Sequence, residues 1–548
     1  MCLKTTLNSK LFLLFFLLSV TTFFSCEQQH NKPGPSGFAD ESFADKLSVL
    51  MKPVDTAATK KMRPLRDDVR LVYQLDDYQP IWVKANYASN DAAAKLIEEL
   101  EDMRWDGVDP ERYNLTAIKL LKTKLDTTKK NSVNDAIAFD TTLTRSFLAA
   151  SKFLLLGEIQ PKKVDSLWFH INDSSWNAPR LLVDNKERNP LLADFRSEVP
   201  TYELLRQEYK LYYTLASDSS FGNAIYNVNV LEHIDSEMLS SINYIIQSEM
   251  PWVAPVANDT MSDEAQLVRA YQSYKAIKPT GKFDSTTLAE LKTRPDDYMK
   301  KLKANMERVR WMQRSFGDLY IVVDVPLMEL FLRRQGVDAM HMRVVVGKKE
   351  RQTPSLYATM ANVVINPPWG VPLTILKNDV LPGLQKSGKQ YMTKKGLKAY
   401  DHDGNIVNAS SINMRNYRRY TYKQAPGDDN SLGYVKFNLP NPWDIYLHDT
   451  PHRDDFGKRF RALSSGCIRL QQPQEMALYI LSELEKKYYT QGKLDTLIAT
   501  HKTRWEILKN KIPVHIAYLT AFEDTTGKHI QFVRDVYGRD EKLMAMMK

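Results

Sequence analysis

The spacing of the apolar residues changes near residue 319, and this change divides the chain into two kinds of structure. Before residue 316, apolar side chains recur at helical intervals, as in the helix-forming run at 92–100 and the apolar stretch at 137–156. From Leu319 onward, short runs of β-branched and aromatic residues are typical of strands. A chain of 548 residues is also too long for one hydrophobic core. We therefore expect an α+β multidomain protein with a helical N-terminal part and a mostly β C-terminal part.

The helical part is expected to contain three units. Residues 46–223 show helical patterns without residues suited to chemistry, which indicates a helical scaffold domain. Residues 224–298 form a smaller helical unit, and residues 299–316 form a helix that links it to the β-rich part. The remaining residues, 317–548, then make up one further domain.

The smaller unit resembles a helical peptidoglycan-binding module. Leu267, Tyr271 and Tyr274 share one helical face, a turn follows at 278–281, and Asp284 or Ser285 can cap the next short helix. The two tyrosines could stack on sugar or peptide, but packing in the core is the more common use of such residues.

The β-rich part is expected to carry one long insertion. Residues 373–430 are polar, rich first in lysine and later in arginine and tyrosine. Such a segment could be a lid that covers substrate, or a solvated surface insertion. The strands that flank it are predicted at 319–323, 327–331, 342–346, 361–366, 434–437, 444–447 and 514–518.

The first 45 residues have the pattern of an exported protein. Lys4 and Lys10 precede an apolar run at 11–24 that is too short to span a bilayer, and Cys26 follows. This pattern resembles a bacterial lipoprotein signal over residues 1–25, with Cys26 as the lipidated residue. An ordinary secretory signal and an uncleaved membrane anchor are the alternatives. Residues 26–45 are rich in Pro, Gly and Ser and are predicted to be a flexible tether.

The net charge argues against a nucleic-acid-binding protein. The chain carries a formal charge of +9, which falls to +7 when the two lysines of the signal are removed. This charge is spread along the chain without a dense Lys/Arg block, whereas nucleic-acid binding needs a concentrated basic patch. Modest basicity suits an envelope protein near anionic polymers or lipid head groups.

One cysteine stands out as a candidate nucleophile. Of Cys2, Cys26 and Cys467, the first leaves with the signal and the second is the predicted lipidation site, so an exported protein keeps one free thiol. His448 lies 19 positions before Cys467, far enough for a loop to fold back and bring imidazole to thiol. The alternative is a small buried Cys467 and a structural His448. Neither a CxxC nor an HExxH motif is present, so no metal site is predicted.

The residues around this cysteine resemble a known family. His448–Thr450 and Ser465–Arg469 resemble the signature of YkuD-type L,D-transpeptidases, which cross-link peptidoglycan. The order of the parts is similar to the long YcbB-like subgroup, which has a scaffold domain, a peptidoglycan-binding-like module and a catalytic domain with a capping insertion. Many short family members have His at the position of Ser465, a difference that the long subgroup tolerates.

The resemblance implies a role for each site residue. Cys467 would be the nucleophile and His448 its base, with His452 as the alternative base. The backbone carbonyl of Asp449 would orient His448, and N–H groups around Gly466 and Cys467 would hold the oxyanion. The residues implied in substrate contact or in shaping the site are Arg469, Ser465, Tyr446 and Trp369.

The resemblance also implies an activity. The enzyme would form 3→3 cross-links through a Cys thioester, without metal or organic cofactor. It would act on peptidoglycan stem peptides at the periplasmic side of the envelope, with a lipid anchor in the outer membrane and cell-wall synthesis proteins as possible partners. An L,D-carboxypeptidase, an enzyme that exchanges the stem-peptide amine, and a non-catalytic wall-binding scaffold remain as alternatives.

Overall fold

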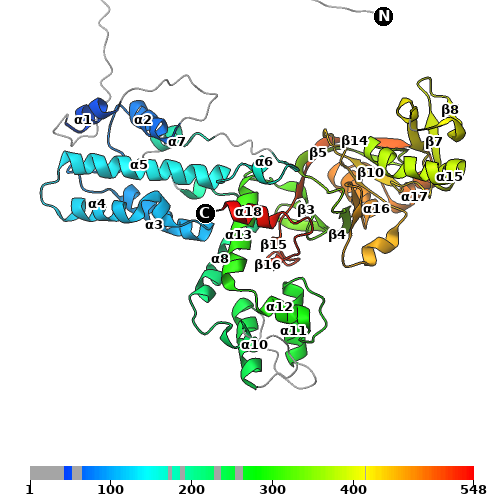
Figure 1. Cartoon of the computed structure of the whole chain (residues 1–548). Coiled ribbons are helices and arrows are strands. Elements are labelled where there is room, and N and C mark those ends of the chain that lie inside the picture. The colour runs from blue at the N-terminus through cyan, green and yellow to red at the C-terminus, as the bar shows by residue number, and fades with distance from the viewer. Residues whose placement is uncertain are drawn as a thin grey trace, which may run out of the picture.

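Both kinds of structure occur in the order expected from the sequence (Figure 1). The computed structural model describes residues 42–51, 64–170, 176–184, 192–226, 236–252, 263–413 and 415–547. The predicted signal peptide, Cys26 and most of the predicted tether lie outside these residues. Within the described part of the chain, no helix has the length and apolar character needed to cross a bilayer.

The N-terminal helices pack around a core of their own, in which the 24-residue helix α5 is the central element. Asp140 of α5 is fully buried and accepts hydrogen bonds from Tyr73 Oη at 2.6 Å and from the backbone of Trp82 at 2.7 Å. These bonds satisfy a buried carboxylate and tie the first helices together. The helices are α1 (Ser42–Leu50), α2 (Leu65–Leu75), α3 (Asp91–Asp102), α4 (Leu115–Thr127), α5 (Val133–Leu156), α6 (Pro161–Val164) and α7 (Ala178–Asp184).

A second group of helices connects this bundle to the β-rich domain. The predicted linking helix 299–316 is displaced: α13 begins at Pro295, whose fixed φ suits a first helical position, and ends at Arg310. After it the chain turns and buries Trp311 against Trp168. The group comprises α8 (Pro200–Ala216), α9 (Asn223–Tyr226), α10 (Ser236–Glu249), α11 (Asp263–Tyr274), α12 (Ser285–Leu291) and α13 (Pro295–Arg310).

The predicted tyrosine face of α11 packs inward. Tyr271 is fully buried and Tyr274 packs against the same core, so core packing is the observed use of both. Asp284 caps α12 by accepting a hydrogen bond from Thr287 N at 2.9 Å. We call α10, α11, α12 and the turn between α11 and α12 the helical module; these helices lie below the rest of the molecule in Figure 1.

The β-rich domain is built on a sheet that closes on itself. Its strands follow the order β1-β5-β10-β11-β13-β4-β3-β2-β14, and β14 also pairs with β5. These strands are β1 (Trp168–Phe169), β2 (Leu319–Asp324), β3 (Glu329–Arg334), β4 (Val337–Gly347), β5 (Ser355–Ile365), β10 (Val435–Asn438), β11 (Leu447–His448), β13 (Ile468–Leu470) and β14 (Arg504–Ala517). β12 (Ala462–Ser464) pairs with β4 alone. The strand predicted at 514–518 therefore does return to the common sheet.

One predicted strand was wrong in most of its length. The run 444–447 is extended only at its end, in β11, because Asn441 fixes the preceding residues in a turn. The Asn441 side chain donates to Ile445 O at 2.7 Å and accepts from Ile445 N at 3.2 Å, and Asp444 has a left-handed φ of 54°. His448 still stands at the end of the strand, as predicted.

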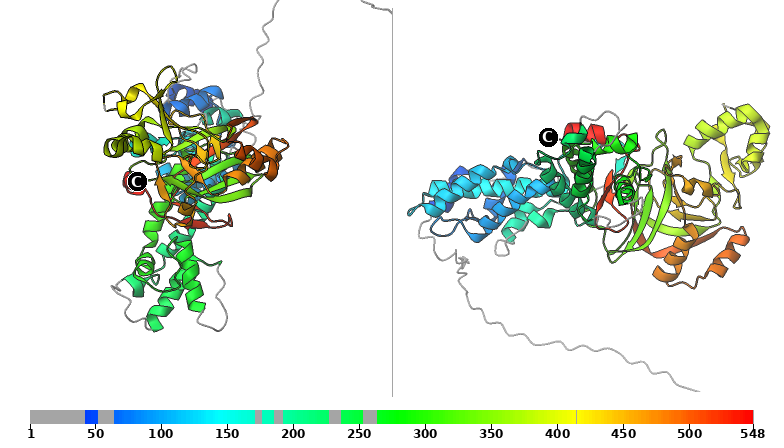
Figure 2. Two further views of the ribbon diagram at one scale, coloured as in Figure 1. Left: turned by 90° about the vertical axis from the view of Figure 1, so that its right-hand side faces the viewer. Right: turned by 90° about the horizontal axis from the view of Figure 1, so that it is seen from below.

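Residues 369–424 form a separate subdomain with its own sheet and hydrophobic core, which we call the lid. It projects from the end of the molecule farthest from the N-terminal bundle (Figures 1 and 2). Its helical part comprises α14 (Leu373–Ile375), the π-helical turn Leu376–Val380 and α15 (Leu381–Lys394). Its sheet comprises β6 (Trp369–Gly370), β7 (Leu397–Tyr400), β8 (Ile406–Val407) and β9 (Thr421–Gln424).

The C-terminal region returns to the helical group. After α16 (Pro473–Leu478) and α17 (Gln491–Ala499), the hairpin β15 (Ala521–Glu523) and β16 (Ile530–Phe532) approaches the helical module, and α18 (Asp540–Met546) packs on α13. Arg308 of α13 donates to Asp540 of α18 at 2.5 Å. Glu307 accepts from the backbone of Glu158 and Ile159, at 2.6 and 2.7 Å. Buried ion pairs and hydrogen bonds thus join the parts of the chain.

Candidate active site

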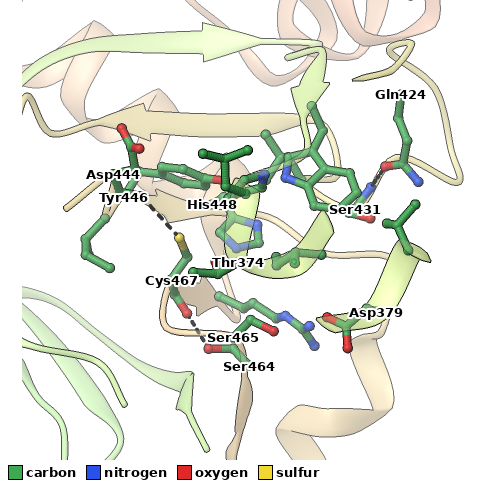
Figure 3. Close-up of a pocket in the computed structure, with 18 of the residues that line it drawn as sticks. Thr374, Asp379, Gln424, Ser431, Asp444, Tyr446, His448, Ser464, Ser465 and Cys467 are labelled. Carbon is green, nitrogen blue, oxygen red and sulfur yellow. Dashed lines mark hydrogen bonds between the residues drawn. The ribbon is translucent and has the colours of Figure 1, made fainter. Parts of the chain in front are cut away.

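Two neighbouring parallel strands bring Cys467 and His448 into one cavity. β11 pairs with β13 so that His448 lies opposite Arg469, and Cys467 immediately precedes β13. The Ile468 amide donates to Tyr446 O at 3.2 Å and holds the two segments together. Figure 3 shows the imidazole and the thiol in the same cavity, which has a volume of 530 Å³.

The His448 imidazole is buried, neutral and fixed in one tautomer. Its Nδ1 donates to the backbone oxygen of Asp449 at 2.5 Å, which leaves Nε2 unprotonated and able to accept a proton. Burial, with the positive charges of Arg469 and Lys436, lowers the pKa of His448 to about 3.

The Cys467 thiol is half-buried and protonated. Its Sγ donates to the backbone oxygen of Asp444 at 3.5 Å. Burial raises the pKa of the thiol above its ordinary value, and this effect is opposed by hydrogen bonds from Tyr446 and by the charge of Lys436. The site at rest therefore holds a neutral thiol and a neutral imidazole.

A network of hydroxyl groups fixes the turn before Cys467. Ser464 Oγ donates to Cys467 O at 2.6 Å and accepts from Gly466 N at 3.1 Å. Thr353 Oγ1 donates to Gly466 O at 2.7 Å. Gly466 has a φ of 119°, which disfavours other residues there. Its amide is already bonded to Ser464, so Gly466 does not offer a free N–H to the cavity in this state.

The Asp449 side chain faces away from the cavity and supports the His448 backbone. Its carboxylate accepts from the amides of Tyr434 at 2.9 Å and Thr450 at 2.7 Å, and from Arg453 Nη1 at 3.0 Å. It packs so closely on Gly433 that a Cβ there would lie 2.4 Å from the Asp449 carboxyl carbon. Asp449 thus acts on His448 through its backbone carbonyl, while its side chain anchors the loop.

The other residues singled out in the sequence lie around the same cavity. Arg469 bonds Asp455 at 3.2 Å, and the Tyr446 ring lies under Lys436 Nζ at 4.0 Å. The lining residues include Tyr446, Ser465, Arg469, His452 and, from the lid, Trp369, Leu373, Thr374, Asp379, Tyr391 and Gln424. The lid therefore supplies a large part of the wall.

Arg351 connects the lid to the segment that carries Cys467. It lies between β4 and β5, donates to Ser465 Oγ at 3.0 Å, and forms a two-pronged ion pair with Asp379 of the lid, one contact of which is 2.8 Å. The sequence did not predict this pair, because one member lies in a loop and the other in a π-helical turn 28 positions away. The sequence reasoning also missed Lys436, although a lone lysine between Val435 and Phe437 in a strand was a usable signal.

Comparisons with known proteins identify the family of the two matched domains. Residues 318–507 match the model of the L,D-transpeptidase catalytic domain, and residues 67–208 match that of the Scaffold domain. A Haemophilus influenzae protein named "Putative L,D-transpeptidase" is 30% identical over 394 residues, which cover 66% of this chain and 76% of that protein. The chain belongs to the L,D-transpeptidase family.

Solved structures of L,D-transpeptidases align with a smaller part of this chain than the Haemophilus influenzae protein does. The enzyme from Mycobacterium smegmatis is 14% identical, over 36% of this chain and 58% of that one, with a TM-score of 0.19. An Enterococcus faecium L,D-transpeptidase mutant is also 14% identical, over 51% of this chain and all of that one, with a TM-score of 0.18. At these values the solved structures add nothing to the family assignment.

Proposed function

We propose that this L,D-transpeptidase family member forms 3→3 cross-links in peptidoglycan through a thioester at Cys467. The observation that carries the proposal is the pairing of β11 with β13, which brings the only thiol among the described residues and a tautomer-fixed histidine to one lidded cavity. A nucleophile, a base oriented by a third group, and a pocket that limits water are the parts that acyl transfer requires.

The first half-reaction releases D-alanine. Cys467 Sγ attacks the carbonyl carbon between the L-centre of the third residue and the D-Ala of a tetrapeptide stem, while His448 Nε2 accepts the thiol proton. Backbone N–H groups stabilise the resulting oxyanion. The N–H group of Gly466 can do so only after its hydrogen bond to Ser464 Oγ is broken. The C–N bond then breaks, His448 returns the proton to the leaving amine, and a thioester remains.

The second half-reaction joins two stems. A side-chain amine of a neighbouring stem attacks the thioester carbon, His448 takes the amine proton and passes it to the departing Sγ. The thiol is restored and an amide forms. Thioesters react readily with amines, and a closed lid would keep competing water away.

Neutral partners at rest favour proton transfer during attack over a preformed ion pair. Because burial raises the pKa of Cys467 and lowers that of His448 to about 3, both groups are neutral at physiological pH. Transfer to Nε2 as the C–S bond forms avoids a separate, costly charged state in a buried site.

The substrate contacts, the domain bounds and the location of the protein are further parts of this proposal. Arg469, Ser465, Tyr446 and Trp369 would contact the stem peptide, since all four line the cavity. We assign residues 46–223, 224–298 and 317–548 to the scaffold domain, the module and the catalytic domain, with 373–430 as the capping insertion. Cys26 would carry the lipid that holds the protein at the periplasmic face of the outer membrane.

The products of purified muropeptides test the activity. Incubation of the wild type with disaccharide-tetrapeptides should give dimers joined by a 3→3 link, together with free D-alanine, and Cys467→Ala should give neither. Tripeptide monomers alone would mean that water is the acceptor, as in an L,D-carboxypeptidase. Added D-amino acid appearing at position four would mean amine exchange. Dimer formation by a folded Cys467→Ala variant would show that the nucleophile is wrongly assigned.

A further inference from the structure

A second cavity, of 880 Å³, lies where the helical module meets the catalytic domain. One wall is the end of α11 and the turn before α12, the opposite wall is formed by 326–329 and 459–461, and Lys301 and residues 531–534 complete it. It shares no lining residue with the cavity at Cys467. We call it the module cleft.

The acidic residues of the module cleft are all engaged within the protein. Glu329 pairs with Arg461 at 2.9 Å, Glu290 accepts from Tyr298 Oη at 2.5 Å, and Asp284 caps α12. These contacts leave the three carboxylates charged, so they lower the positive charge of the cleft, but only Glu329 forms an ion pair with one of its basic residues in the described part of the chain.

Four of the six basic residues that line the cleft have no carboxylate partner within the described residues. Lys275 pairs with Glu249 at 2.9 Å and Arg461 with Glu329. The four without an ion pair are Lys278, Lys301, Arg459 and Arg534. Lys278, Arg459 and Arg534 stand exposed at the rim, where a ligand could reach them. Six cations and three carboxylates line the cleft, so its lining carries a net positive charge, which favours a ligand with several negative charges.

Lys301 is the cation whose environment points most clearly to an anionic ligand. It is half-buried, its Nζ donates to Val533 O at 2.9 Å, and burial lowers its pKa. An ammonium has three donors, so one carbonyl leaves two without a protein partner. A carboxylate in the cleft would supply the missing acceptors and offset the cost of burying the charge.

The cleft also offers apolar surface beside its charges. The Phe460 side chain is 46% exposed, and Arg534 lies over its ring at 5.6 Å. Leu327 and Val536 line the same space. Apolar surface beside separated cations fits a peptide with short aliphatic side chains and several carboxylates, because a neutral oligosaccharide would leave the net positive charge of the cleft unbalanced.

We propose that the module cleft binds an acidic peptide, namely a stem peptide of the wall polymer other than the one that reacts at Cys467. The charge of the ligand follows from the cleft itself, and its identity as a stem peptide rests on the proposed function. The cleft would hold a neighbouring part of the polymer while the active site works.

The position of Arg459 links such binding to the active site. Arg459 bonds the backbone oxygen of Ala276 in the module, and its segment continues through Arg461 and β12 to Ser464, which fixes the turn before Cys467. A peptide in the module cleft therefore contacts the chain segment that carries the nucleophile.

Direct binding to the full chain tests the proposal. The wild type, acylated at Cys467 by imipenem so that the active-site cavity is filled, and the Cys467→Ala variant would both be titrated with a fluorescent tetrapeptide that lacks sugars. We expect saturable binding in both. When Lys278→Gln and Arg534→Gln are introduced together into either protein, the affinity for the tetrapeptide should fall by about tenfold, as the loss of two partly exposed ion pairs with the peptide predicts.

A matched control removes two charges from the same elements outside the cleft. Lys282 lies in the turn before α12 and Lys528 lies just before β16; both are exposed and neither lines the cleft. Lys282→Gln with Lys528→Gln should leave tetrapeptide affinity within about twofold, as expected for charges that make no contact.

Three results would overturn the proposal. Equal loss of affinity in the two double variants would show that binding depends only on the net charge of the protein. Unchanged affinity in the Lys278/Arg534 variant would place the peptide elsewhere, and binding of uncharged chitotetraose in place of the tetrapeptide would show a sugar site. Failure of the proposed function would look different, because peptide binding to Cys467→Ala would persist while the wild type formed neither thioester nor dimer.

Discussion

At Cys467 and His448, two neutral groups share a buried site, and the protein chain around them sets their protonation. The Asp449 carbonyl fixes the imidazole tautomer, and the Asp444 carbonyl accepts a hydrogen bond from the thiol in the resting state. The thiol must therefore leave Asp444 before His448 can accept its proton.

The pH dependence of acylation follows from these protonation states. The pKa of His448 is about 3 and that of Cys467 lies above its ordinary value, so neither group titrates between about pH 5 and 8. The acylation rate with imipenem, followed by stopped-flow fluorescence, should be flat over this range. It should rise only at alkaline pH, where thiolate forms. An acidic limb with its midpoint near the ordinary histidine value would contradict a neutral pair.

The two histidines of the cavity separate the roles of base and lining residue. His448→Ala should lower the acylation rate by roughly 10²–10⁴-fold, the usual contribution of a general base. His452→Ala removes an imidazole from the same cavity and should change the rate by less than about threefold, since a residue that only lines the pocket takes no proton. Single-turnover kinetics with imipenem measures both. A larger loss of rate in His452→Ala than in His448→Ala would show that His452 is the base.

The candidate residues could be found from the sequence because a single free thiol behind a predicted export signal, and a histidine at a strand end, are themselves informative. The contacts of these residues could not be predicted from the sequence. Asn441 converts a strand-like run into a turn through its own side chain, and Ser464 occupies the Gly466 amide. Such effects depend on where a side chain points after folding, which residue type and spacing do not determine.

At the level of elements, the lid and the sheet meet through Arg351. The boundary between helical and strand patterns was predictable, and so were most strands, because apolar periodicity reflects burial directly. The Arg351–Asp379 ion pair was not predictable, since it joins a loop to a π-helical turn and leaves no periodic signal in the sequence. It holds the lid against Ser465, two residues from Cys467.

Breaking this contact should loosen the lid. Arg351→Ala removes both bonds, so hydrogen exchange should increase at 373–394, and more thioester should be lost to water than to amine. The ratio of tripeptide to dimer products should rise severalfold. Arg419→Ala, which removes an exposed lid arginine that does not line the cavity, is the control. Identical exchange and product ratios in the two variants would exclude a role for Arg351 in closure.

At the scale of the whole molecule, a buried cluster joins helix α8, the helical module and the hairpin β15–β16. Lys275 Nζ bonds Glu249 at 2.9 Å and Tyr212 Oη at 2.7 Å, and it lies 3.6 Å from the centre of the Tyr298 ring. Phe532 of β16 covers the same ammonium at 5.0 Å. A charge shared by elements so distant in sequence fixes how the domains sit together.

Removing this charge should destabilise the assembly. Lys275→Met leaves Glu249 buried without its partner, which costs about 3–5 kcal/mol for a pair of this kind. Calorimetry should show a lower Tm for the variant, while Lys278→Met, three residues away and exposed, should unfold at nearly the wild-type temperature. A Lys275→Met variant as stable as the wild type would show that packing alone holds the domains.

The central claim is that Cys467 becomes acylated, and intact-protein mass spectrometry after incubation with imipenem tests it most directly. A β-lactam traps a nucleophile that normally forms an acyl-enzyme. The account predicts that the wild type gains the mass of one imipenem and that Cys467→Ala, shown to be folded by circular dichroism, gains none. An adduct on Cys467→Ala, or no adduct on the folded wild type, would contradict it.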